Sequence, residues 1–63
     1  MSIANIIAVE PVVVEGIPVA VEVTFQTKTG TRTYLYDGLS VAAAIIKGED
    51  PVRYAGTLVN KDE

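Results

Sequence analysis

The clearest hydrophobic pattern in this chain lies between Val19 and Thr27, where two sets of side chains alternate. The apolar set is Val19, Val21, Val23 and Phe25, and the other set is Ala20, Glu22, Thr24 and Gln26. A period of two is typical of a strand that buries one face. A second alternating run, Thr31–Tyr36, follows Lys28-Thr29-Gly30. A three-residue loop that ends in glycine often joins two strands, so the two runs are predicted to form an antiparallel hairpin.

The loop length also predicts the register of this hairpin. Phe25 is expected opposite Thr33, and Val23 opposite Leu35, which places Thr33 and Leu35 on the apolar face. The other face is then polar and aromatic, and it consists of Glu22, Thr24, Gln26, Arg32, Tyr34 and Tyr36.

The N-terminal segment is predicted to be a strand as well. β-branched residues dominate Ile3–Val9 and Val12–Glu15. Pro11 has no N–H for a sheet ladder, so it marks a bulge, a bend or an edge position, and the strand can break there. The following Gly16-Ile17-Pro18 is predicted to be a turn.

Leu39–Lys47 is predicted to be a short helix. Asp37 or Ser40 can accept the free N–H groups at its start, and Gly48 suits the position after its end. The run Val41–Ile46 is apolar all round, which is typical of a helix covered on more than one side. One side can lie on the sheet, and nothing else in the chain is left to cover the other.

The last predicted strand is Val52–Val59, and a charged tail follows at residues 60–63. The resulting order, β-β-β-α-β, predicts an α+β fold in which a small curved antiparallel sheet carries one short helix. A chain of 63 residues is expected to be a single domain.

Composition predicts that this domain is a homo-oligomer. In so small a chain the gain from apolar burial is nearly offset by the entropy of ordering the residues. Cysteine and histidine are absent from the sequence, which removes disulfides and the usual zinc, copper and iron sites, so no metal or cofactor is expected. Association is the remaining source of stability. The predicted interface includes Val41, Ala44, Ile45, Val52 and Leu58.

Charge and hydropathy limit the class of partner. The net charge of −3 and the pI near 4.7 make a sequence-independent nucleic-acid binder unexpected, because such proteins need a basic surface. A small anionic ligand needs only one or two local cations. The N-terminus lacks the pattern of a signal peptide, and no apolar stretch reaches the roughly 18 residues of a membrane span. A cytoplasmic location without a membrane partner is expected.

The residue types do not indicate catalysis. Nucleophile–base pairs built on histidine or cysteine are excluded. The five glycines are isolated, so no glycine-rich phosphate loop is present. The carboxylates are scattered without a paired acid–base signature. The chain is therefore expected not to be an enzyme.

Two groups of side chains near the hairpin are candidate ligand sites. On the polar-aromatic face, tyrosine rings can stack on a base and Arg32 can pair with a phosphate; the alternative is a solvated face whose cross-strand pairs stabilise the hairpin. At the hairpin tip, Lys28, Thr29 and the neighbouring hydroxyls suit a phosphate; the alternative is an ordinary polar turn.

Two other groups are weighed in the same way. Glu49, Asp50 and Asp37 could hold a hard cation, but the calcium-loop spacing is missing, which favours turn and capping roles. Arg53 and Tyr54 are a second arginine–tyrosine pair that could reach a ligand between subunits. The predicted ligand-binding residues are Lys28, Thr29, Arg32, Tyr34, Tyr36, Arg53 and Tyr54.

Three functions are compatible with these features. The first is a non-catalytic oligomer that sequesters a small anionic, nucleotide-like ligand at subunit interfaces, by analogy with small phage accessory proteins that neutralise host defences. The second is a protein inhibitor or adaptor that acts through an exposed strand edge or an acidic surface. The third is a structural subunit whose function is assembly.

Overall fold

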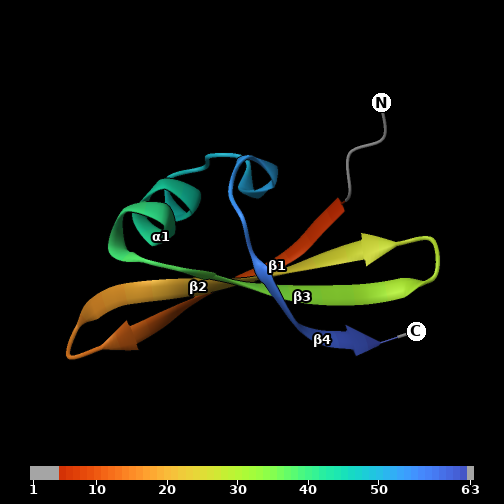
Figure 1. The fold of residues 1–63 in the computed structure, drawn as a ribbon, viewed down its shortest axis with the longest axis horizontal. Helices are drawn as coiled ribbons and strands as arrows, with labels where there is room; N and C mark the ends of the chain where they lie inside the picture. The colour runs from red at the N-terminus through yellow and green to blue at the C-terminus, as the bar shows by residue number, and fades with distance from the viewer. Residues whose placement is uncertain (1–4, 63) are drawn as a thin grey trace.

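The computed structural model describes residues 5–62, which form four strands, one α-helix and one 3₁₀ turn (Figure 1). In chain order these are β1 Asn5–Val14, β2 Ile17–Thr27, β3 Gly30–Asp37, α1 Leu39–Ile46, η1 Pro51–Arg53 and β4 Thr57–Asp62. The predicted α+β fold, with the order β-β-β-α-β, is confirmed. Ile3, where the first strand was predicted to begin, lies outside the described residues.

The four strands form one antiparallel sheet in the spatial order β1-β2-β3-β4, so β1 and β4 are its edges. Figure 1 shows a strongly twisted sheet with α1 and η1 on the same side of it. The helix packs mainly against β2. The predicted arrangement of one helix on one face of the sheet is confirmed.

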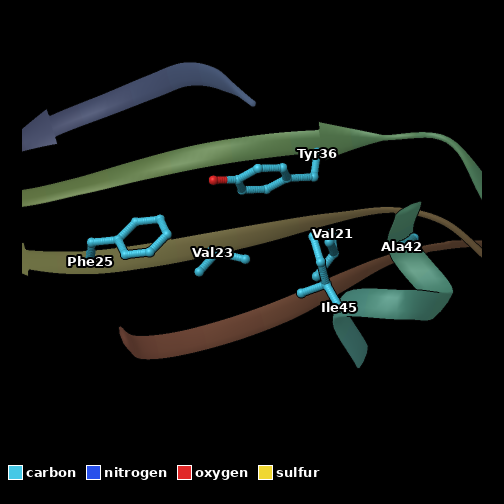
Figure 2. Packing of buried hydrophobic residues seen from close by; sticks show 6 residues of the cluster. All are labelled: Val21, Val23, Phe25, Tyr36, Ala42 and Ile45. Carbon is cyan, nitrogen blue, oxygen red and sulfur yellow. The ribbon is translucent and has the colours of Figure 1, made fainter. Parts of the chain in front are cut away.

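The core lies between α1 and the adjacent face of β2 and β3. Figure 2 shows its six residues: Val21, Val23, Phe25, Tyr36, Ala42 and Ile45. Val21 and Val23 are completely buried, which confirms the face predicted from the alternation in β2. Ile45 points into this core, so it is not on the free side of the helix.

The predicted register of the β2–β3 hairpin is wrong by one residue. A two-residue loop, Lys28-Thr29, joins the strands, so that Val23 lies opposite Tyr34 and Phe25 opposite Arg32. Residues opposite each other in an antiparallel pair point to the same face. Arg32, Tyr34 and Tyr36 therefore lie on the core face of β3, and Thr33 and Leu35 lie on the other face.

Side-chain packing explains the observed register. The ring of Tyr34 packs edge-to-face against Phe25, with ring centroids 5.8 Å apart and planes at 77°, a favourable geometry for two aromatic rings. On the opposite face, the hydroxyls of Thr24 and Thr33 lie 2.9 Å apart and form a hydrogen bond. The sequence interpretation treated tyrosine as polar, although most of its surface is an apolar ring.

β1 is one continuous strand, so the break that the sequence left open at Pro11 does not occur. Pro11 pairs with Val21 on an edge strand, which confirms the predicted edge position. The turn that follows is Glu15-Gly16, and the predicted turn at Gly16-Ile17-Pro18 is wrong because Ile17 and Pro18 already belong to β2. Glu15 and Gly16 both have positive φ, 52° and 81°, as two-residue hairpin turns that match the sheet twist require.

The last strand is shorter and later than the predicted Val52–Val59. The Asp50 carboxylate accepts a hydrogen bond from the N–H of Val52 at 3.1 Å, and Pro51 occupies the first position of η1. This cap starts a 3₁₀ turn in place of a strand. β4 then runs through residues 60–62, which the sequence interpretation assigned to a charged tail, and Asn60 pairs with Thr33.

The two ends of α1 are stabilised differently. At the C-terminus, Gly48 has a φ of 115°, its N–H donates to the Ile45 carbonyl, and the N–H of Glu49 donates to the Ala44 carbonyl, both at 3.0 Å. This is the Schellman pattern, and the predicted role of Gly48 is confirmed. At the N-terminus the cap is Gly38 and no side chain caps the helix, so the predicted capping by Asp37 or Ser40 is wrong.

Gly56, in the segment between η1 and β4, is needed because of the neighbouring Tyr36 ring. A Cβ at this position would lie 2.7 Å from both Cε2 and Cζ of Tyr36. We expect Gly56→Ala to lower the free energy of unfolding by about 1–3 kcal/mol, as overpacking of a core does, measured by urea denaturation. In a Tyr36→Leu background the same change should cost less; an equal cost in both backgrounds would contradict this contact.

The observed register predicts a specific disulfide. Because the Thr24 and Thr33 hydroxyl oxygens are 2.9 Å apart and the chain has no cysteine of its own, the double variant Thr24→Cys/Thr33→Cys should oxidise readily to an intramolecular disulfide. The matched pair Thr24→Cys/Tyr34→Cys should stay reduced, since its side chains point to opposite faces. Mass spectrometry under non-reducing conditions distinguishes the two results.

Candidate functional site

A pocket of about 240 Å³ opens on the core face of the sheet. Its lining comes from three elements: Phe25 and Thr27 of β2, Arg32, Tyr34 and Tyr36 of β3, and Val52 of η1. Three of the predicted ligand-binding residues, Arg32, Tyr34 and Tyr36, are thus brought together.

The pocket exists because α1 is too short to cover the sheet. Eight helical residues span about 12 Å, whereas the eleven residues of β2 extend over about 36 Å. Ala42 and Ile45 of the helix cover the end of the core face that contains Val21. Phe25 lies at the other end of that face, where η1 contributes Val52 to the pocket.

Arg32 is the unusual residue of the pocket. Among the residues whose side chains the structure describes, 5–61, its buried Nε has no hydrogen-bond partner, and none of the ion pairs includes its guanidinium. Buried side-chain donors in proteins nearly always have a partner, because leaving one unpaired is costly. A guanidinium with an unpaired N–H at a pocket wall is therefore suited to an acceptor that enters the pocket.

Tyr34 and Tyr36 give the same pocket aromatic walls. Tyr36 is almost fully buried, and Figure 2 shows its hydroxyl pointing along the sheet toward the Phe25 end. Burial, with smaller contributions from Tyr34 and Asp50, raises the pKa of the Tyr36 phenol above its ordinary value of 10.0. The hydroxyl is therefore neutral at physiological pH and can both donate and accept a hydrogen bond.

Lys28 and Thr29 of the hairpin tip do not line this pocket, although the neighbouring Thr27 does. Lys28 and Thr29 are exposed on the loop, and the turn already uses the neighbouring polar groups. The Thr27 hydroxyl donates to the Gly30 carbonyl at 2.8 Å, and the N–H of Thr29 donates to the Thr27 hydroxyl at 3.3 Å. These bonds fit the alternative of an ordinary polar turn.

Arg53 and Tyr54 lie outside the pocket lining. Arg53 is largely exposed and forms an ion pair with Glu49 at 3.5 Å, and Tyr54 packs half-buried against the core cluster. The neighbouring acidic residues have local roles: Asp50 caps η1, and no group of three carboxylates that could hold a metal ion occurs in the described part of the chain.

The predicted interface residues are distributed between the core and the surface. Ile45 is buried within its own chain, so it offers nothing for a second copy to cover. Val41 and Ala44 are half-buried. Val52 and Leu58 are exposed by 67% and 45%, so they remain available to a partner.

Phe25, Thr27 and Val52 line the pocket but were not predicted as ligand residues. The alternation in β2 identified Phe25 as apolar. The one-residue register error placed Arg32 on the opposite face of the hairpin, so the two residues were not predicted to share a site. The position of Val52 could have been found from the preceding Asp50-Pro51 pair, because this pair predicts a capped turn at Val52 and not a strand. Thr27 carries no such signal in the sequence.

Comparisons with known proteins give no relative for this chain. No protein family, curated protein or solved structure matches it. In the part of the chain that the structure describes, no helix has the length and hydrophobicity needed to cross a membrane.

The raised pKa of Tyr36 predicts how stability depends on pH. A folded-state pKa above the unfolded value means that folding favours the neutral phenol, so this contribution is complete below about pH 10 and is lost as the pH rises through the folded-state pKa. As the pH rises above about 10, we expect the free energy of unfolding to fall less for Tyr36→Phe than for the wild type. Urea titrations of both proteins at several pH values test this, and equal slopes would contradict it.

Proposed function

We propose that this protein is a non-catalytic, homo-oligomeric binding protein that sequesters a small anionic, nucleotide-like ligand. The observation that carries the proposal is the buried Nε of Arg32, which has no hydrogen-bond partner in the described part of the chain and lies in a pocket that also holds Phe25, Tyr34 and Tyr36.

The two kinds of group in this pocket match the two parts of a nucleotide. A guanidinium binds phosphate oxygens through two parallel N–H donors, which makes arginine well suited to phosphate recognition. Aromatic side chains bind bases by stacking, which tolerates any base. The rings of Phe25 and Tyr36 are nearly fully buried, whereas Tyr34 is half-buried. Because Arg32 and Tyr34 share one face of the sheet, one ligand can use both.

The size of the pocket supports partial enclosure of the ligand. Its volume of about 240 Å³ is below the roughly 300–1,000 Å³ of typical small-molecule pockets. One part of a nucleotide then fills the pocket, and the rest lies over the exposed rim at Val52.

The lining also supports binding without catalysis. It contains one cation, three aromatic rings, one valine and one threonine. The hydroxyl of that threonine, Thr27, already donates to a backbone carbonyl. None of the lining residues is a carboxylate that could act as a general base toward a bound ligand.

The homo-oligomeric part of the proposal is supported by exposed apolar side chains. Within residues 5–61, twelve large hydrophobic residues are exposed, whereas seven hydrophobic residues are buried, namely the six of the core and Ala20. A domain with so small a core usually gains stability by association.

A nucleotide panel that includes cyclic dinucleotides, measured by isothermal titration calorimetry, tests the proposed ligand class. Sequestration of a nucleotide signal is the activity that a phage anti-defence protein would have. If none of the nucleotides gives a binding isotherm, the proposed ligand class is wrong.

Arg32 should account for much of the affinity. Hydrogen bonds to charged groups contribute about 1.5–3 kcal/mol, so Arg32→Ala should weaken binding by roughly 10- to 150-fold. Arg32→Lys should weaken it too, because lysine keeps the charge but lacks the fork of donors. The matched control is Arg53→Ala, which removes an exposed arginine and should leave the affinity unchanged. Equal affinity losses at both positions would contradict a role of the pocket.

A protein inhibitor or adaptor is a second candidate function, favoured by the ten-residue edge strand β1. Recovery of one partner protein in stoichiometric amount, together with no response to any nucleotide, would favour it.

A further inference from the structure

Lys61 of β4 lies directly opposite Arg32 of β3 in the sheet. The sequence interpretation assigned Lys61 to a charged tail, whereas in the structure it belongs to β4. Residues opposite each other in an antiparallel pair point to the same face, with Cβ atoms about 4.5–5.5 Å apart. The lysine therefore lies on the core face beside Arg32, the arginine of the ligand pocket.

The juxtaposition of Arg32 and Lys61 is unfavourable within the protein alone. Like charges directly opposite each other destabilise a sheet, and the Arg32 Nε has no hydrogen-bond partner in the described part of the chain. An anion bound between the two side chains would remove the repulsion and supply that partner. Lys61 takes part in another interaction, but its ammonium has three donors, so the anion adds a partner and does not need to displace one.

The charged side chains of the strands are segregated between the two faces of the sheet. Glu22 alternates with the buried core residues of β2, so it lies on the face opposite the core. Glu10 pairs with Glu22, and Asp37 pairs with Ala20, so both carboxylates share that outer face. Among the strand residues within 5–61, the core face thus carries two cations and no carboxylate. An anion that approaches the pocket meets these cations first, although the chain as a whole has a net charge of −3.

We propose that Arg32 and Lys61 together bind one phosphate group of the ligand, and that this group is a terminal phosphate with two negative charges. A phosphate monoester is a dianion above its second pKa of about 6, whereas the phosphodiester of a cyclic nucleotide carries a single charge. Two cations within reach of one phosphate match the dianion. This assignment rests on the proposed function and narrows the ligand to nucleotides with a terminal phosphate, and it makes Lys61 a specificity-determining residue.

The next pair on the same face gives the base a place beside the phosphate. Tyr34 lies two residues along β3 from Arg32 and pairs with Leu58 of β4. Two residues extend over about 7 Å of a strand, a spacing that one nucleotide can span. Tyr34 is half-buried and Leu58 is exposed, so a base can lie against this pair while its phosphate is held between Arg32 and Lys61.

Two adenine nucleotides whose phosphates differ in charge test this assignment on the full chain at about pH 8, where the monoester is a dianion. We expect adenosine 5′-monophosphate to bind at least about tenfold more tightly than adenosine 3′,5′-cyclic monophosphate, measured by isothermal titration calorimetry. Lys61→Ala should weaken binding of the 5′-monophosphate about tenfold and leave binding of the cyclic nucleotide unchanged. The matched control is Lys47→Ala, which removes an exposed lysine after α1 and should change neither affinity.

Three results would overturn the dianion site and leave the proposed function standing: equal affinities of the two nucleotides, equal losses in Lys61→Ala and Lys47→Ala, or an equal loss for both nucleotides in Lys61→Ala. If neither nucleotide binds, inorganic phosphate titrated at constant ionic strength and followed by amide NMR separates the two proposals. Shifts of the Arg32 amide that Lys61→Ala abolishes would support the phosphate site and overturn the nucleotide class. No shift at Arg32 would overturn both.

Discussion

The contact between the rings of Tyr34 and Phe25 decides which face of β3 is buried. Side chains alternate along a strand, so fixing Tyr34 on the core face also fixes Arg32 and Tyr36 there. Tyr36 then joins the core beside Val21 and Val23, and its ring leaves space only for a glycine at position 56. One aromatic contact thus determines the register of the central hairpin, the composition of the core and the lining of the pocket.

Burying the Nε of Arg32 on this face has a cost that the rest of the structure must offset. An unpaired buried donor destabilises a fold, since its hydrogen bond to water is lost and not replaced. The threonine pair on the opposite face and the aromatic contact on the core face both stabilise the same register. Local departures from good packing chemistry concentrate at functional sites, so the unpaired Nε of Arg32 is the observation on which the proposed function rests.

The sequence predicted those features that depend on local patterns. The alternation in β2 identified Val21, Val23 and Phe25 as core, and Gly48 marked the end of α1. The register was not predictable in the same way. A two-residue loop and a three-residue loop shift β3 by one position, and this shift moves every side chain of β3 to the other face of the sheet. Choosing between them required knowing that Tyr34 packs on Phe25, which is a contact between strands and not a local preference.

The candidate site was predicted in part for the same reason. Arg32, Tyr34 and Tyr36 alternate along β3, so any register keeps them on a common face, and their grouping was predictable. Their position on the core side, beside Phe25, was not. Val52 reaches the pocket only because Asp50 and Pro51 start a 3₁₀ turn where the sequence interpretation expected a strand.

A short helix on a larger sheet leaves two surfaces uncovered, and their chemistry separates their roles. At the open end of the core face, the surface contains an unpaired guanidinium donor among aromatic rings. Such a surface suits the anionic, planar ligand of the proposed function, whereas an apolar protein surface would leave the donor unpaired. Along β1, the exposed side chains are aliphatic except for Asn5 at its start and Glu10 and Pro11 at its centre. That surface has few side-chain donors or acceptors with which to hold a small polar ligand. The two surfaces therefore differ in the chemistry that they offer to a partner.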